Sequence, residues 1–159
     1  MHKDNLLKTV KNCISILGKL QQILDQESQF LKHNQLEKVA DLNDHKMSTL
    51  KQYTGLRDQV CQDLKISRKY YHQPTIEDQI KKNFSEHDTQ LLDNIEQLWR
   101  DQHCCRNQLI INQNIISARM QFLNKPSSQL TVSMQKGRLL YAKIDTQDYY
   151  ESVAGKLTL

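Results

Sequence analysis

The feature that most constrains this chain is a helical row of apolar residues between its only two prolines, Pro74 and Pro126. Successive apolar positions are three or four residues apart, or sums of these, which is the period of an α-helix and not of a strand. No glycine or proline interrupts the row, and Pro126 would end it. An unbroken helix of this length measures roughly 70 Å and needs partner helices to bury its stripe. The row is Ile80, Phe84, Leu91, Leu98, Cys105, Leu109, Ile116 and Leu123, with Ile95 and Trp99 beside it.

Capping residues predict where this long helix begins and where it can break. Thr75 followed by Asp78 is a capping-box pattern, so we expect the helix to start there. A break is expected near Asn83 and Ser85, because Ser85 together with Asp88 could start a second cap.

Composition favours long helices over any β-rich fold. Only 38% of the 159 residues are hydrophobic and 6% aromatic, and four glycines with two prolines are too few for a turn-rich β protein. We therefore predict an all-α fold, an elongated antiparallel helical bundle or coiled coil of about three long helices. Such a bundle has little core volume in which to build a buried active site.

The first predicted helix carries a coiled-coil heptad pattern and begins near Asp4 or Asn5. Leu7, Ile14, Ile23 and Phe30 widen its seam enough to contact two partner helices. The seam is Leu6, Val10, Cys13, Leu17, Leu20, Leu24, Glu27 and Leu31.

Glu27 is the one charged residue on this seam, and two interpretations stay open. Its carboxylate either reaches water at the edge of the interface or pairs with a cation of the next helix, Lys46 or Arg57. That next helix either starts after a break near residues 33–35 or continues the first. Its inward seam is Leu36, Val39, Asn43, Lys46, Leu50, Tyr53, Arg57, Val60 and Leu64, or, in a rotated helix, Leu42, Met47 and Leu56.

The C-terminal part of the chain differs from the rest in its charge. From Asn107 to Ile116 the sequence has no charged residue and places apolar residues on more than one face. After Pro126 the apolar residues are irregularly spaced, as in a segment that orders against a partner. We predict a helical bundle domain at 1–125 and a flexible C-terminal segment at 126–159. The tail tyrosines Tyr141, Tyr149 and Tyr150 suit an interface, although they could also fold the tail onto the body.

No motif predicts catalysis, a cofactor or a metal site. Cys104 and Cys105 are adjacent and would point about 100° apart on a helix, so they cannot both bind one zinc ion. Without a CxxC spacing, the four cysteines are expected to be reduced thiols in the cytosol. No signal peptide or apolar run for a stable membrane insertion is present, so we expect a cytoplasmic protein. The net charge of +4 is scattered, and no nucleic-acid partner is predicted.

The order of these elements resembles the FlgN family of flagellar type III export chaperones. The similar residues are a leucine-rich seam ending in Gln26-Glu27, a second helix with Lys46, and an asparagine-marked segment at 112–116 before Phe122-Leu123 and Pro126. Leu140-Tyr141 stands near the position of the family's tail Leu-Tyr. Gln113 replaces the glycine that often follows the family's asparagine, and Tyr150 is a rival for the tail tyrosine.

The resemblance implies a chaperone that binds the C-terminal helices of flagellar hook-associated proteins of the FlgK/FlgL type. It would prevent their premature aggregation and deliver them to a flagellar export gate protein of the FlhA type. Tyr141 would contact the gate. An amphipathic substrate helix would cover an apolar face that the free chaperone leaves exposed. By position, the substrate-binding residues would be Leu109, Asn112, Ile115, Ile116, Arg119, Met120, Leu123 and Leu130.

Two other classes of function stay open at the level of the sequence. A structural or adaptor protein could self-associate into a homo-oligomer through the heptads at residues 6–31. A redox protein or enzyme could use Cys104 or Cys105.

Overall fold

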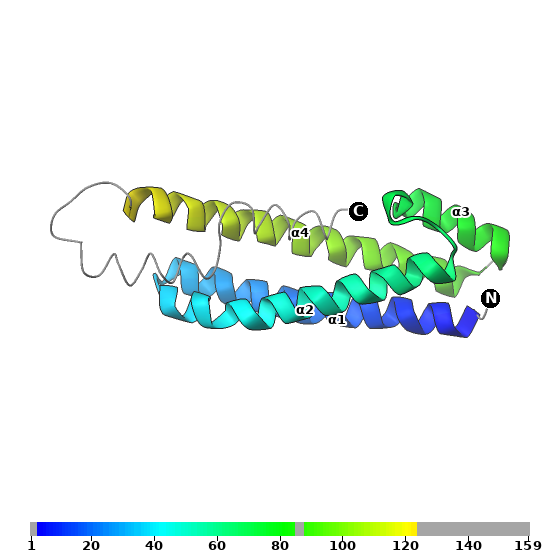
Figure 1. Ribbon diagram of the computed structural model, residues 1–159, viewed down its shortest axis with the longest axis horizontal. Helices are drawn as coiled ribbons and strands as arrows, with labels where there is room; N and C mark the ends of the chain where they lie inside the picture. Colours follow the sequence, from blue (N-terminus) through cyan, green and yellow to red (C-terminus); the bar gives the residue numbers. More distant parts are fainter. Residues whose placement is uncertain (1–2, 85–87, 124–159) are drawn as a thin grey trace.

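The computed structural model describes residues 3–84 and 88–123, which form an elongated bundle of four α-helices (Figure 1). They are α1 (Lys3–Lys32), α2 (Leu36–Asp63), α3 (Gln73–Asn83) and α4 (Thr89–Leu123), with a short 3₁₀ turn, η1 (Arg68–Tyr70), before α3. No strand occurs among the described residues, and the predicted all-α class is confirmed. The predicted count of about three helices differs from the observed four. The predicted tail at 126–159 lies outside the described residues.

Helix α1 is the centre of the bundle, because it packs against both α2 and α4, while α3 packs on α4. α2 returns antiparallel to α1, whereas α4 runs in the same direction as α1 (Figure 1). The side chains of α4 that reach backbone carbonyls of α1 do so at a constant sequence separation of 88. Constant separation with seven-residue steps is a parallel pair in heptad register. The pairs are Cys105 with Leu17 (3.4 Å), Asn112 with Leu24 (3.0 Å), and Arg119 with Leu31.

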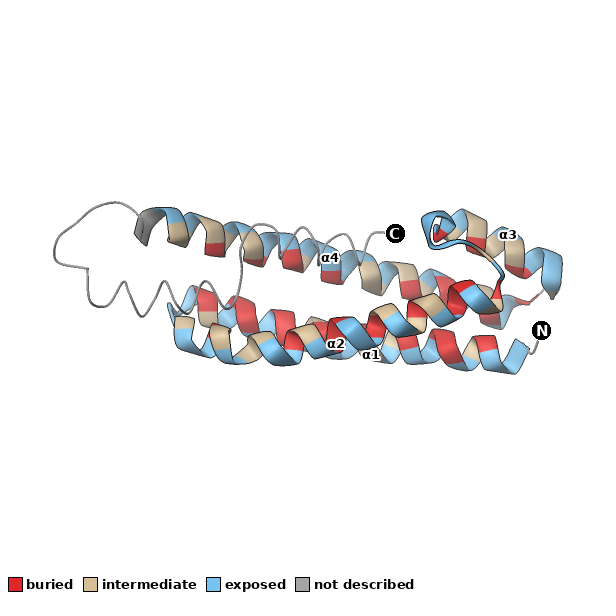
Figure 2. Cartoon of the chain, in the orientation of Figure 1, coloured by how far each residue is buried: buried red, intermediate tan, exposed pale blue. Residues whose placement is uncertain are grey.

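The predicted seam of α1 is confirmed at every position. All eight of its residues, from Leu6 to Leu31, are 0% exposed, and they form a buried stripe that Figure 2 shows in red. The flanking Ile23 is buried, while Leu7, Ile14 and Phe30 are half-buried against the core. α1 therefore packs against two helices at once, as the width of its apolar stripe predicted.

Of the two predicted inward seams of α2, the structure has the first. Val39, Leu50 and Val60 are buried, together with the polar Lys46 and Arg57. The residues of the alternative rotation, Leu42, Met47 and Leu56, are only half-buried. The observed rotation buries the two cations, Lys46 and Arg57. It is preferred over the alternative because it also brings Tyr53 and Leu64 into the core.

The break between α1 and α2 is confirmed at residues 33–35, and it uses no glycine. Asn34 takes the left-handed conformation (φ 57°), and the Gln35 amide donates to the Phe30 carbonyl at 2.8 Å. This pattern is a Schellman-type end, in which asparagine replaces the usual glycine. α2 ends in the same way, with Lys65 at φ 55° and the Ile66 amide donating to Cys61 at 2.9 Å.

The long apolar row is divided into α3 and α4, as the predicted break near Asn83 and Ser85 allowed. Asp88 starts α4: its Oδ1 accepts from the Leu91 amide at 3.3 Å, and its Oδ2 lies 2.6 Å from the Lys3 ammonium. The hydrogen bond from Lys3 and that of the Leu91 amide lower the pKa of this carboxyl. A charged cap at the positive end of α4 thus ties the break to the first turn of α1.

The predicted start of the row at Thr75 is wrong by two residues. α3 begins at Gln73 after His72, which makes no side-chain cap, and Pro74 lies in the first turn. Proline suits this position because the amide it lacks would have no partner there. The fixed backbone of Pro74 therefore sets the start of the helix in place of the capping box.

Candidate functional site

The C-terminal half of α4 has an inner face that the bundle buries completely. Leu109, Asn112 and Ile116, three of the predicted substrate-binding residues, are at most 1% exposed and continue the stripe of Cys105. Their steps of three and four place them on one side of the helix, which faces α1. The structure thus makes these three side chains part of the core.

A buried polar layer joins three helices at Asn112. Glu27 of α1, Lys46 of α2 and Asn112 of α4 are all 0% exposed. The Lys46 ammonium forms an ion pair with Glu27 Oε1, and the Asn112 amide donates to Glu27 Oε2 at 2.8 Å and to the Leu24 carbonyl at 3.0 Å. Gln108 donates to Asn112 Oδ1 at 2.9 Å. Each carboxylate oxygen of Glu27 therefore has a donor, which offsets much of the cost of burying its charge.

The layer decides between the two interpretations of Glu27. The pairing with Lys46 is confirmed, and Glu27 does not reach water. Arg57, the other candidate partner, instead lies 3.4 Å from Asp58, which also binds Arg68 at 2.5 Å. Sequence reasoning gave Asn112 a role at the surface and missed its place in this layer. The available signal was its position one heptad after Cys105 in the apolar row.

Arg119 closes the end of α1. Its guanidinium donates to the Leu31 carbonyl and to the Asn34 side chain, at the turn where α1 stops. A cation at this end is favourable because the last carbonyls of a helix carry partial negative charge. Ile115 and Met120, two other predicted contact residues, are half-buried against the core. The side chain of Leu123 is not described, and Leu130 and Tyr141 lie outside the described residues.

The opposite side of this half of α4 is an exposed face without charge, which we call the outer face. It contains two of the three large hydrophobic residues that are exposed in the described part of the chain, Ile110 (36%) and Ile111 (50%). No charged residue occurs from Asn107 to Ala118. The lack of charge in this stretch is evident from the sequence, whereas the exposure of the isoleucine pair is not. The outer face consists of Asn107, Ile110, Ile111, Asn114 and Ala118.

The buried thiols behave as small apolar side chains. Burial raises the pKa of Cys13 and of Cys105 to about 12, so both stay protonated at neutral pH and are poor nucleophiles and metal ligands. The Cys105 thiol donates to the Leu17 carbonyl at 3.4 Å. Within residues 3–84 and 88–123, no group of three or more histidine, cysteine or acidic side chains converges on one point. Nor is any helix in this part of the chain apolar over the length of a bilayer.

Comparison with known proteins identifies the family. The sequence model of one family, described as FlgN protein, matches residues 1–143, which is most of the chain. No curated protein and no solved structure gives a significant match. The match spans all four helices of the bundle, including the inner and outer faces of α4. The chain therefore belongs to the FlgN family of flagellar export chaperones.

Proposed function

We propose that the chain is a cytoplasmic chaperone for hook-associated, or hook–filament junction, subunits of the FlgK/FlgL type. It holds their C-terminal helices, prevents their premature aggregation or assembly, and delivers them to an export gate protein of the FlhA type. Family membership supports the general activity. The observation that supports a helix-binding site is the outer face of α4, where Ile110 and Ile111 are exposed in a stretch without charge.

The outer face suits an amphipathic helix for a physical reason. Ile110 and Ile111 leave apolar surface in water, and covering it is favourable by about 25 cal/mol per Å². Around them lie amides and small side chains, which impose no charge requirement on the partner. A substrate helix laid along α4 would bury both isoleucines, in the manner of helix-in-groove recognition.

The predicted contact residues fall into two groups under this proposal. Ile115, Leu123 and Leu130 are retained as proposed substrate contacts, Ile115 because it borders the outer face. Arg119 binds the end of α1 and Met120 packs against the core. Leu109, Asn112 and Ile116 hold α4 against α1 from the inside and thereby position the face. Tyr141 is proposed as the contact with the export gate.

Binding of a purified hook-associated subunit tests the proposal. Calorimetric titration would compare the full chain with the double variant Ile110→Gln/Ile111→Gln. We expect at least about tenfold weaker binding, because two exposed apolar anchors become polar. Tyr70→Gln is the matched control, since Tyr70 is 52% exposed and distant in sequence. Equal binding by all three proteins would contradict this site, and no binding by the full chain would contradict the function.

The alternative of a self-associating coiled coil has less support. It needs the heptad seam at residues 6–31 to be free, and every residue of that seam is buried against α2 and α4 of the same chain. Sedimentation of the full chain tests it: a stable oligomer that dissociates when Leu17 alone is replaced, with the fold retained, would favour the alternative.

A further inference from the structure

A groove between α1 and α2 lies apart from the outer face of α4. It is a cavity of about 480 Å³, and every residue that lines it belongs to α1 or α2. Ile16 and Leu56 form an apolar floor, since both are half-buried and pack against the core. Asn12, Ser15 and Gln52 are exposed around this floor. The groove therefore combines a half-buried apolar floor with a polar rim.

The rim of this groove carries positive charge. Lys19 of α1 and Lys51 of α2 line it and are exposed, and neither forms an ion pair with any residue in the described ranges. No acidic side chain lines the groove among the residues that the structure describes. Along α1, residues 5–24 contain no acid either, while Lys8 and Lys11 are exposed. Negative charge in an occupant is therefore favourable.

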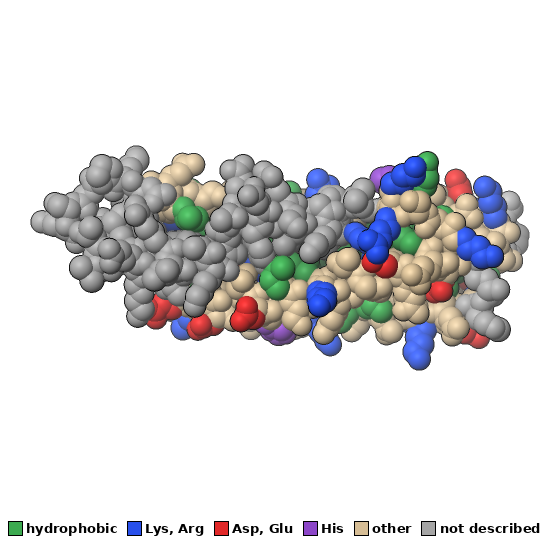
Figure 3. Space-filling view, viewed as in Figure 1, with side chains coloured by type: hydrophobic (Ala, Val, Ile, Leu, Met, Phe, Trp, Pro, Cys, Tyr) green, Lys and Arg blue, Asp and Glu red, His purple; other side chains and the backbone are tan. Residues whose placement is uncertain are grey.

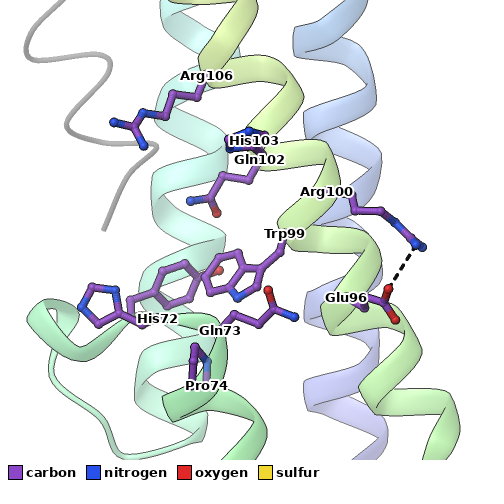
Figure 4. A pocket seen from close by; sticks show the side chains of 10 residues that line it. His72, Gln73, Pro74, Glu96, Trp99, Arg100, Gln102, His103 and Arg106 are labelled. Carbon is purple, nitrogen blue, oxygen red and sulfur yellow. Dashed lines mark hydrogen bonds and ion pairs between the residues drawn. The ribbon is translucent and has the colours of Figure 1, made fainter.

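A second cavity, of about 610 Å³, differs in its charge. It opens between the connector before α3 and one side of α4 (Figure 4). Glu96 and Arg100 both line it, and they bind each other at 3.2 Å. Acidic and basic side chains thus already meet there, whereas the groove between α1 and α2 has cations alone.

Gly55 opens the middle of the groove on the α2 side. A glycine inside a helix costs about 1 kcal/mol relative to alanine. The packing of the described residues does not require it, because a Cβ at Gly55 would meet no atom within 4 Å. Its backbone does not require it either, since no described glycine has a positive φ. Close approach of another segment to α2 is a physical reason for a glycine at this position.

One segment of the chain outside the described residues matches the groove in charge. Residues 144–155 contain three acidic residues and no cation, and these three are all the acids that follow α4. The same segment contains Tyr149 and Tyr150, whose rings can cover an apolar floor while their hydroxyls stay in water. The acidic residues are Asp145, Asp148 and Glu151.

The acidic segment is within reach of the groove. The last turns of α4 lie beside the end of α1, where Arg119 binds the Leu31 carbonyl. From Leu31 back to Lys19 the distance along α1 is about 18 Å. Residues 124–143 join α4 to the segment, and a connection of this length can span up to about 66 Å. Tethering of this kind gives a local concentration of about millimolar, so individually weak contacts suffice.

We propose that the groove between α1 and α2 binds the chain's own acidic segment, residues 144–155. The carboxylates meet Lys19 and Lys51 at the rim, and the tyrosine rings cover Ile16 and Leu56. A nucleic acid would find the lysines but no aromatic side chain on which a base could stack. The site is separate from the outer face of α4, and the proposal does not depend on the substrate.

Zero-length crosslinking of the full chain tests the contact. A carbodiimide joins a lysine to a carboxylate only where the two side chains touch, and mass spectrometry identifies the linked residues. Lys32 and Lys38 are internal controls, because both are exposed and closer to the end of α4 than the groove is. We expect the three acids to link to Lys19 or Lys51 at least about fivefold more often than to the controls, in the monomeric fraction.

A pair of glycine variants separates binding in the groove from simple tethering. Gly55→Leu fills the groove without changing a charge and should reduce the links to Lys19 and Lys51 about fivefold. Gly18→Leu is the matched control and should leave them unchanged, since Gly18 is also exposed inside a helix but does not line the groove.

Four outcomes would overturn the proposal. They are the absence of links from the acidic segment, links spread evenly over the four lysines, an equal effect of the two glycine variants, and links confined to crosslinked dimers. The last would assign the segment to the groove of a second copy.

Discussion

The two faces of the C-terminal half of α4 have nearly the same composition and different surroundings. Ile116 on the inner face is 0% exposed, whereas Ile111 on the outer face is 50% exposed. Asn112 is buried in the polar layer, and Asn114, two residues later, is exposed. Position around the helix, and not residue type, therefore separates the residues that hold this bundle from those that are exposed.

The space-filling view is consistent with a bundle whose charges are spread over its surface. In Figure 3 lysines, arginines and acids are interspersed over the visible described surface, with small hydrophobic areas between them. The uncharged outer face is thus distinguished from most of the surface by its lack of charge. Four pairs of substitutions test the contrast between inside and outside, and a ninth substitution tests the cap of α4.

The largest effect is expected at the charge that the bundle buries. Glu27→Ala should lower the free energy of unfolding by about 4 kcal/mol, since it removes the buried carboxylate that pairs with Lys46 and one of the two acceptors of the Asn112 amide. Glu96→Ala, which removes an exposed carboxylate paired with Arg100, should cost less than about 0.5 kcal/mol. Urea denaturation measures both. Similar losses of unfolding free energy in the two variants would contradict the burial of the ion pair between Glu27 and Lys46.

The isoleucine pair gives the most direct contrast between the two faces. Ile116→Ala should cost about 3 kcal/mol of unfolding free energy, because it leaves a cavity between α4 and α1. Ile111→Ala should change it by less than about 0.5 kcal/mol. The shift of the urea midpoint, at an unchanged dependence of the unfolding free energy on urea, measures the difference. An equal loss of unfolding free energy at Ile111 and Ile116 would show that the outer face is packed in the free chain.

Asn112 and Asn114 give the same comparison of inner and outer face for polar residues. Asn112→Ala should cost about 2 kcal/mol, because Glu27 Oε2 loses its donor inside the core. Asn114→Ala should be neutral or slightly stabilising, since alanine has the higher helix propensity. Thermal unfolding followed by circular dichroism would compare them. Neutral behaviour at both positions would contradict the network.

A smaller effect is expected at the end of α1. Arg119→Ala should cost about 1 kcal/mol, because the Leu31 carbonyl loses a charged donor at the negative end of the helix. Amide exchange in the last turn of α1 should increase with it. Arg106→Ala, an exposed arginine of the same helix with no ion pair in the described ranges, is the control and should leave the turn unchanged.

The smallest effect is expected at the cap of α4 and depends on pH. The pKa of Asp88 is lowered from its ordinary value of 3.8, chiefly by the hydrogen bond from Lys3. A depressed pKa stabilises the fold above pH 3.8 and loses this contribution as the pH falls through the folded-state value. Asp88→Asn retains a capping side chain but no charge, so it should cost about 0.5 kcal/mol near neutral pH and nothing at low pH. A pH-independent difference would exclude the charge as its cause.

The periodicity predicted most of this fold. Heptad spacing identified the full seam of α1, including Glu27, because a long amphipathic helix has only one way to bury its stripe. The partner of Glu27 stayed ambiguous, since Lys46 and Arg57 lie on one face of α2 and only the α1–α2 register selects between them. The start of α3 was missed because Pro74 outweighed the capping box at Thr75.

The candidate site was harder to predict than the core. The uncharged stretch was evident from the sequence, but its two faces were not separated, because apolar residues occur on both. Only the constant separation of 88 residues between α4 and α1 decides that Asn112 and Ile116 face inward and Ile110 and Ile111 outward.

The central claim is that the outer face of α4 contacts the substrate helix. Site-specific photo-crosslinking tests it most directly, with benzoylphenylalanine placed at Ile111 in one variant and at Tyr70 in another, since both positions are about half exposed. Each variant is irradiated with a purified hook-associated subunit. We expect a crosslinked complex from position 111, mapped to the C-terminal helix of the subunit, and none from position 70. A crosslink from position 70 with none from position 111 would contradict it.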